Sequence, residues 1–313
     1  MPLFVGERAV SSSINSSAEL MQDFPELEKT SCEFASKEQR TFGNETILYI
    51  GQREYGTVYP NDNSVDIIGS DSATTCQIVV LRHKGSGVCS LAHFDGVGIS
   101  EALAEMVASL QDHVPEHKGN RIEMHIVGGF SDSRKSSEDV FMKILRGACQ
   151  TAFEIDLLCT CVCNLNDTIM NGKHVPIIYG LGVLVQSGEV VPVKQFDCQI
   201  PDEILRHCVI HSYEQKVLQV YSSLTQEVKI KPVDVFCPKE IAMSRASLSD
   251  EIILKNFSTS PHCEPPNFAE KLRKMFQFLA ENQNILQKYF PRGEPRRFRL
   301  NDNREWCLVE NNS

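Results

Sequence analysis

The sequence predicts an α+β fold in which antiparallel β-sheets are layered with helices. Three observations lead to this prediction. Apolar runs of strand length recur through the middle of the chain, short polar turns join two pairs of them, and amphipathic helical patterns occur in only a few places. This combination is typical of helices packed on antiparallel sheets.

The expected strands lie in the middle of the chain. They cover residues 47–50, 57–59, 65–68, 78–81, 88–92, 121–127, 155–162, 177–185 and 189–193. Lys84-Gly85-Ser86-Gly87 joins two of these runs, and Gln186-Ser187-Gly188 joins two others. Both segments carry the glycine and small polar residues that hairpin turns favour, so each pair is expected to form antiparallel neighbours.

Helical patterns flank and interrupt these strands. Residues 100–110 place their apolar side chains on one stripe, and a second helix is expected from about Ser137. A longer amphipathic pattern covers residues 268–286, and Pro265-Pro266 lies just ahead of it, as a helix start allows. A short helix is also expected at residues 18–24.

Length and composition are those of an ordinary globular protein. A chain of 313 residues can bury a large core, and 42% hydrophobic with 23% charged residues is typical of soluble domains. We expect a single domain over residues 1–313. Its core covers approximately residues 45–195, and the C-terminal part, 196–313, packs on it.

Charge and hydropathy argue against two classes of partner. The net charge of −10 disfavours nucleic acid, because phosphate binding needs a basic surface. No apolar run reaches the roughly 18 residues of a membrane-spanning helix, and the N-terminus lacks the regions of a signal peptide. We expect a protein of the cytoplasm, and also of the nucleus, that binds neither nucleic acid nor membrane. The oligomeric state is left open.

The 12 cysteines are expected to be reduced thiols. They are spread over a long chain without a signal peptide, which argues against a disulfide framework. Cys159, Cys161 and Cys163 alternate with other residues, so a strand would place all three on one side. No C-x-x-C pair occurs, and buried thiols account for this cluster better than a zinc site does. We therefore expect no metal.

Cys76 and His93 form the most informative pair in the chain. Cys76 opens one apolar run, and His93 closes the next run 17 positions later. The hairpin between the runs would bring the start of the first strand close to the end of the second. Both side chains would then lie at one edge of a sheet, an arrangement that suits a thiol nucleophile and its base. The alternative is a buried cysteine and a hydrogen-bonded histidine at two strand ends.

Several blocks of the chain resemble the protein N-terminal asparagine amidohydrolases, and together they cover most of its length. The blocks are Met1-Pro2-Leu3, residues 69–76, residues 78–83, residues 127–132, residues 256–261 and Glu264-Pro265-Pro266. The spacing from Cys76 to His93 and the paired glycines further on are also similar to the CheD-type chemoreceptor deamidases. More remotely, they are similar to the cytotoxic necrotizing factor toxins. Gln77 departs from some of these relatives, which carry histidine after the cysteine.

The resemblance implies an α-β-β sandwich with a CheD-like deamidase core. It also implies hydrolysis of the side-chain amide of an N-terminal asparagine to aspartate, with release of ammonia through a thioester on Cys76. The product would enter the N-degron pathway of arginylation and ubiquitin-dependent degradation. Protein or peptide substrates with N-terminal asparagine are the expected partners, and this chemistry requires no cofactor.

The resemblance also assigns an orienting group for the imidazole. In the chemoreceptor deamidases a hydroxyl six positions before the cysteine is similarly placed, which corresponds to Ser70 here. Asp71 and Asp95 are rivals, because a carboxylate would also hold the imidazole in one tautomer.

Two further groups are needed by an enzyme that deamidates an N-terminal residue. The amide of Cys76 and the turn at Gly128-Gly129 are candidates for binding the oxyanion, because glycine lets the backbone approach a ligand closely. Asp71 and Asp132 are candidates for binding the substrate's positively charged α-amino group. A plain strand-ending turn and solvated loop acids are the alternative interpretations.

Two other functions remain open from the sequence. The chain could deamidate glutamine or asparagine side chains inside proteins, or it could bind N-degrons as a scaffold without turnover. A cysteine protease is a weaker possibility, since no cysteine carries a papain-like or caspase-like signature.

Overall fold

The computed structural model describes residues 3–111, 121–212, 214–235 and 237–309. The chain divides into two compact units. Unit 1 comprises residues 1–198 and 216–226, and unit 2 comprises residues 199–215 and 227–313. The expectation of a single domain stays a prediction.

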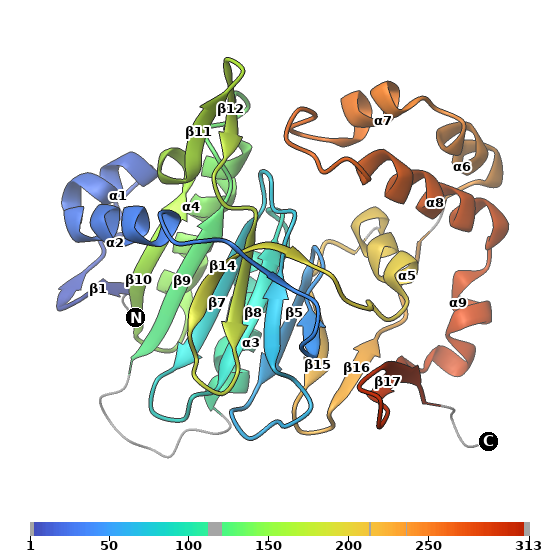
Figure 1. Cartoon of the computed structure of the whole chain (residues 1–313), viewed down its shortest axis with the longest axis horizontal. Helices are drawn as coiled ribbons and strands as arrows, with labels where there is room; N and C mark the ends of the chain where they lie inside the picture. The colour runs from blue at the N-terminus through green and yellow to red at the C-terminus, as the bar shows by residue number, and fades with distance from the viewer. Residues whose placement is uncertain (1–2, 112–120, 213, 236, 310–313) are drawn as a thin grey trace. The chain divides into compact units, whose positions relative to one another are not determined.

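A mixed sheet forms the centre of unit 1 (Figure 1). Its neighbouring strands, in order, are β15 (Leu218–Ser222), β5 (Glu54–Val58), β8 (Cys89–Phe94), β7 (Gln77–His83), β9 (Ile122–Gly128), β10 (Ile155–Val162), β1 (Leu3–Val5) and β2 (Arg8–Ala9). The central strands β5, β8, β7 and β9 pair antiparallel, as predicted. Strand β10 pairs parallel to β9 because a helix crossover connects the two strands.

A second sheet and two helices cover the faces of this sheet. The second sheet contains β3 (Arg40–Phe42), β14 (Val190–Phe196), β13 (Gly180–Leu184), β6 (Ile67–Ser70) and β4 (Ile47–Tyr49). It contacts the large sheet through β6 against β8 and β13 against β9. Helix α3 (Ile99–Gln111) packs against strands β5, β7 and β8. Helix α4 (Ser136–Gln150) packs against strands β1, β7 and β10.

The alternation of β8 separates these two layers. Ala92 and Phe94 belong to the apolar cluster that contains the buried residues of α3 and α4. His93 lies between them, so it faces the second sheet. The order of layers is helices, large sheet and second sheet, which agrees with the predicted α+β class and with an α-β-β arrangement.

The N-terminal segment folds into two helices, of which only the first was expected. Helix α1 (Ser17–Asp23) begins where Ser16 Oγ accepts a hydrogen bond from Glu19 N, 3.1 Å away. Helix α2 (Pro25–Ala35) follows and lies along the edge of β10. Thr30 Oγ1 donates to the Leu158 carbonyl, and Ser31 Oγ accepts from Thr160 N. Side chains of α2 thus satisfy backbone groups at a sheet edge.

A short hairpin follows β10 and was not predicted. The chain leaves β10 through a 3-10 turn (Cys163–Asn166) and forms β11 (Asp167–Met170) and β12 (Lys173–Pro176). Cys163 therefore lies outside the strand that carries Cys159 and Cys161, which corrects the expectation that one strand face holds all three thiols. All three are buried, and burial raises the pKa of Cys159 to about 11.

Unit 2 is mostly helical. Its elements are α5 (Glu203–His207), a 3-10 turn (Cys208–His211), β16 (Glu227–Ile230), α6 (Lys239–Ala246), α7 (Asp250–Phe257), α8 (Phe268–Glu281), α9 (Ile285–Tyr289), a 3-10 turn (Pro291–Gly293), β17 (Arg296–Leu300) and β18 (Trp306–Leu308). The helix expected at 268–286 ends at Glu281. Asn282 caps it, since its Nδ2 donates to the Phe278 carbonyl.

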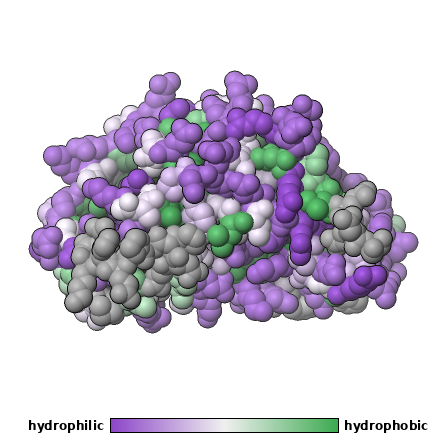
Figure 2. Space-filling model, turned by 90° about the horizontal axis from the view of Figure 1, so that it is seen from below, coloured by the Kyte–Doolittle hydropathy of each residue, from purple (hydrophilic) through white to green (hydrophobic). Residues whose placement is uncertain are grey.

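The surface agrees with the charged composition. Seen from below, it is largely hydrophilic, and hydrophobic side chains form only small patches (Figure 2). Within the described parts of the chain, no helix has both the length and the apolar character needed to cross a membrane.

Candidate functional site

The pairing of β7 with β8 brings Cys76 and His93 to the same edge of the large sheet. Gln77 pairs with Phe94, and Ile78 pairs with His93. Cys76 directly precedes Gln77, so its position is diagonal to that of His93 across the two strands. Diagonal neighbours of an antiparallel pair lie about 7–8 Å apart between backbones, within reach of longer side chains. The hairpin predicted from the sequence is therefore confirmed, and Cys76 is half-buried at its start.

Ser70 contacts the imidazole from the second sheet. Its Oγ lies 2.7 Å from His93 Nδ1, and both residues are buried, with Ser70 at the last position of β6. The contact occupies Nδ1, so Nε2 is the ring nitrogen that does not contact Ser70. The Ser70 hydroxyl is thus within hydrogen-bond distance of the imidazole.

The two acidic rivals bind other groups. Asp95 Oδ2 accepts hydrogen bonds from Arg53 Nε at 2.6 Å and from Gln52 Nε2 at 2.8 Å. Both partners of this ion pair are largely buried, with side-chain exposures of 14% for Arg53 and 10% for Asp95. The guanidinium therefore offsets the charge of Asp95 beside the site.

Asp71 ties the strand that carries Ser70 to its neighbours. Its Oδ1 accepts hydrogen bonds from the Tyr49 hydroxyl at 2.9 Å and from Ser72 Oγ, and its Oδ2 accepts from Phe196 N at 2.9 Å. The carboxylate lies at the surface of the buried region, with 9% of the residue exposed. Asp71 directly follows Ser70, and its negative charge favours the protonated form of His93.

Burial dominates the electrostatics of the imidazole. It lowers the pKa of His93 to about 4, although the nearby charges of Asp95, Asp71 and Glu54 act in the opposite direction. His93 is therefore neutral at neutral pH. A neutral ring with Nδ1 hydrogen-bonded to a hydroxyl can accept a proton at Nε2.

Gly128 packs directly against the backbone of Cys76. It pairs with Gln77, and its φ of +120° is accessible to glycine but strained for other residues. A Cβ at this position would lie 2.7 Å from the Cys76 carbonyl oxygen. Only glycine fits here, so the end of β9 lies directly against the backbone of Cys76.

The next residue, Gly129, is fixed by two neighbours. Its carbonyl accepts a hydrogen bond from Asn166 Nδ2 at 2.8 Å, and a Cβ on Gly129 would meet the side chain of Ser137 at 2.8 Å. Asn166 is completely buried and also holds both backbone groups of Ile178. The turn therefore has a defined backbone geometry.

Asp132 caps helix α4. Its carboxylate accepts hydrogen bonds from the amides of Arg134, Ser136 and Ser137, at 3.1, 3.0 and 2.8 Å. These contacts satisfy backbone donors at the start of the helix. Asp132 therefore binds backbone amides of its own loop and helix. From the sequence, Asp132 was expected only to bind the substrate amine or to be a solvated loop acid.

Gln77 points to the helix layer rather than to the Cys76 side. It is completely buried, and its Nε2 donates to the Ser137 carbonyl at 2.8 Å. Successive residues of a strand face opposite sides, so Gln77 anchors the start of β7 to α4 from behind.

Three residues near the site escaped the sequence analysis. Glu54 is 1% exposed, lies on β5 next to the residue paired with Ala92, and acts electrostatically on His93. Tyr49 holds Asp71, and Asn166 holds Gly129. The available signal for Glu54 was its position directly before the run Tyr55-Gly56-Thr57-Val58. Local sequence contained no comparable signal for the other two.

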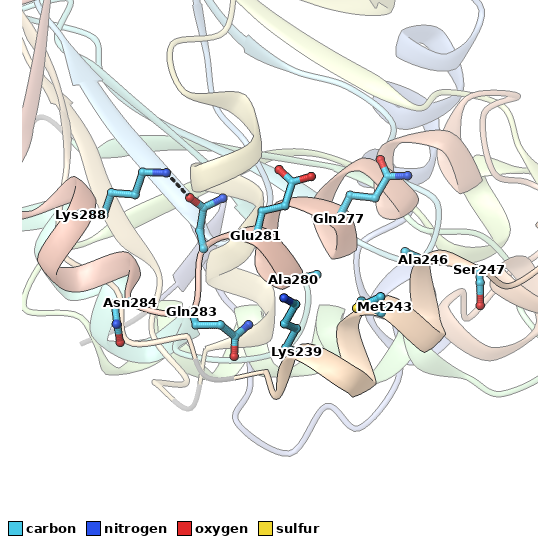
Figure 3. Close-up of a pocket in the computed structure, with 11 residues that line it drawn as sticks. Lys239, Met243, Ala246, Ser247, Gln277, Ala280, Glu281, Gln283, Asn284 and Lys288 are labelled. Carbon is cyan, nitrogen blue, oxygen red and sulfur yellow. Dashed lines mark hydrogen bonds between the residues drawn. The ribbon is translucent and has the colours of Figure 1, made fainter.

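No cation site is evident beside these groups. Among the residues that the structure describes, no three His, Cys, Asp or Glu side chains converge as a metal site requires. One open pocket of about 860 Å³ lies in unit 2 between α6, α8 and α9 (Figure 3). Its lining contains no cysteine or histidine, so it offers no counterpart of the Cys76 and His93 pair.

Comparison with known proteins identifies the family of the chain. A family model described as protein N-terminal asparagine amidohydrolase matches residues 37–308. The chain belongs to this family. The family member from Sus scrofa is 33% identical over 306 residues, which cover 98% of this chain and 97% of the relative. The Homo sapiens member is 32% identical with the same coverage. The Arabidopsis thaliana member is 29% identical over 90% of this chain and 87% of its own.

Family membership confirms the resemblance noted in the sequence. The match extends through both units. The family match thus covers the chain from β3 to β18.

Proposed function

We propose that this protein hydrolyses the side-chain amide of an N-terminal asparagine to a carboxylate and releases ammonia. The observation that carries the proposal is the 2.7 Å contact of Ser70 Oγ with His93 Nδ1, beside a cysteine diagonal to that histidine. The family names of the relatives supply the substrate: each is named a protein N-terminal asparagine amidohydrolase.

The first half of the reaction forms a thioester. His93 Nε2 accepts the proton of the Cys76 thiol, and the sulfur attacks the amide carbon. The carbonyl electron pair moves to oxygen and gives a tetrahedral oxyanion. When this intermediate collapses, the C–N bond breaks, and His93 returns the proton to the leaving nitrogen, which departs as ammonia.

The second half restores the enzyme. His93 accepts a proton from water, and the resulting hydroxide attacks the thioester carbon. The C–S bond breaks, the thiolate regains its proton from His93, and the product carries aspartate at its N-terminus. Ser70 acts throughout by accepting from Nδ1–H, which keeps Nε2 available for proton transfer.

Backbone groups are proposed to stabilise the oxyanion. The amide of Cys76 and the Gly128-Gly129 turn are the donors, and the packing of Gly128 against Cys76 supports this assignment. Asn166 holds the carbonyl of Gly129, so the turn is preorganised before substrate binds.

Recognition of the free α-amino group is assigned to Asp71. Its charge already acts on His93, and the Tyr49 hydroxyl and Phe196 amide fix its position. Asp132 was the other candidate, but its carboxylate binds the amides at the start of α4, whereas the charges that act on His93 are those of Asp95, Asp71 and Glu54. Asparagine and glutamine differ by one methylene, which a pocket distinguishes by about 1–3 kcal/mol. The amine anchor adds to that difference by fixing the distance to the amide.

The product fits the N-degron pathway, in which an N-terminal aspartate is arginylated and the protein is then degraded through ubiquitin. This role places the protein in the cytoplasm or nucleus, with protein substrates as its partners. The cysteine mechanism itself requires neither a metal nor an organic cofactor.

A peptide panel tests the proposal against the two alternatives. Ammonia release and product mass are measured for matched peptides that begin with asparagine, glutamine or acetyl-asparagine. Turnover of the free asparagine peptide alone supports the proposal. Turnover of the acetylated peptide would identify a deamidase of internal side chains, and turnover of none would favour a scaffold.

A further inference from the structure

The hairpin of β11 and β12 presents an exposed apolar tip. Ile169 is 64% exposed and Met170 is 61% exposed, and these adjacent residues pair with His174 and Lys173 across the hairpin. The hairpin projects beyond the ends of β9 and β10 (Figure 1). Two large neighbouring apolar side chains in water are a feature of surfaces that bind a partner.

The base of this hairpin is bound to the loop beside the site. Asn166, the residue before β11, donates to the Gly129 carbonyl at 2.8 Å. Asp167, the first residue of β11, accepts from Ser131 N at 3.1 Å. The hairpin is therefore fixed to the same loop that packs against Cys76.

We propose that this hairpin docks the part of the substrate polypeptide that follows its first few residues. The inference rests on the proposed function. An N-terminal asparagine held at Cys76 is the end of a chain that must continue away from the site, and the hairpin begins at that edge. In the described part of the chain, β11 and β12 pair only with each other, so each strand has an outer edge. An extended polypeptide can add to such an edge and cover Ile169 and Met170.

Geometry makes the docking dependent on substrate length. An extended chain advances about 3.3 Å per residue, so the four-residue strand β11 spans about 13 Å. A substrate of three residues ends before the tip of the hairpin. A substrate of ten residues is long enough to pass it.

The experiment compares two peptides that share the same first three residues, one of three residues and one of ten. KM and kcat are measured for the wild type, for the double variant I169S/M170S and for the control Leu224→Ser. Leu224 is 70% exposed, so the control removes a similarly exposed apolar side chain. Leu224 lies two residues after Ser222, which pairs with Thr57. The control residue is therefore at the opposite end of β5 from Glu54, the residue whose charge acts on His93.

We expect the wild type and the control to bind the long peptide better than the short one. In the double variant, KM for the long peptide should rise by about tenfold, while both constants for the short peptide stay unchanged. An unchanged ratio of long to short KM in the double variant would overturn the inference and leave the proposed function intact. Failure of the wild type to release ammonia from either peptide would refute the proposed function, and the inference with it.

Discussion

Ser70 Oγ lies 2.7 Å from His93 Nδ1, so the last residue of a strand in one sheet holds a buried imidazole of the other sheet. This contact links the two layers at the edge where Cys76 directly precedes β7. It determines which ring nitrogen of His93 is left for the thiol, and the chemistry proposed for the site depends on it.

Removal of the Ser70 hydroxyl should reduce turnover. Ser70→Ala leaves Nδ1 without its partner, so the tautomer and orientation of the ring are no longer fixed. We expect kcat to fall by about 100-fold with little change in KM. Ser90→Ala is the matched control, since Ser90 is also completely buried but bonds to Thr57 and Gly56. Equal losses in both variants would indicate a packing effect rather than a role for Ser70.

The buried histidine should make the fold sensitive to acid. The pKa of His93 is about 4 in the folded protein and about 6.5 when unfolded, so the unfolded chain binds the proton more readily. The associated stability is fully present above pH 6.5 and is lost as the pH falls toward 4. It amounts to on the order of 3 kcal/mol. Urea unfolding of wild type and His93→Gln between pH 7 and pH 4 measures this part, and identical pH dependence in the two would contradict it.

A methyl group at Gly128 should damage both the fold and the site. Gly128→Ala would place a carbon 2.7 Å from the Cys76 carbonyl oxygen, at a φ of +120°. We expect the free energy of unfolding to fall by about 2–3 kcal/mol and kcat to fall at least about tenfold. Gly6→Ala is the control, because Gly6 also has a positive φ but nothing within 4 Å. Thermal unfolding and ammonia release distinguish the two. Full activity of Gly128→Ala would argue against an oxyanion role for this turn.

Substitutions of the two candidate acids, Asp71 and Asp132, should have different effects. Asp71→Asn is expected to raise KM for a peptide with a free amine by about tenfold or more, because a charge partner of the amine is lost. Asp132→Asn should instead lower the free energy of unfolding by about 1 kcal/mol through the α4 cap, with KM unchanged. Steady-state kinetics and denaturation of both variants check this assignment. The opposite pattern would move the amine site to Asp132.

Much of the central sheet could be predicted because its signals are local. The turn at 84–87 and the apolar runs beside it predicted that Cys76 and His93 share an edge, and the observed register agrees. Local patterns could not place Ser70, because its contact with His93 joins two sheets across 23 positions. Only the family resemblance identified that residue.

Other parts escaped prediction for physical reasons. The hairpin at 167–176 is short and largely exposed, so it lacks the alternation that a half-buried strand shows. Helix α2 buries Leu27 and Phe34 but also bonds through Thr30 and Ser31 to the edge of β10, and hydropathy does not register these polar contacts. Glu54 lies in a strand whose expected start was set too late, at residue 57.

The most direct test of the proposed mechanism is the substitution of Cys76 by alanine. Ammonia release from a peptide with N-terminal asparagine is measured for Cys76→Ala and for Cys149→Ala, which removes another half-buried thiol, on α4. The account predicts that Cys76→Ala falls to the uncatalysed rate and that Cys149→Ala keeps the wild-type rate. Deamidation by Cys76→Ala at the wild-type rate would contradict it.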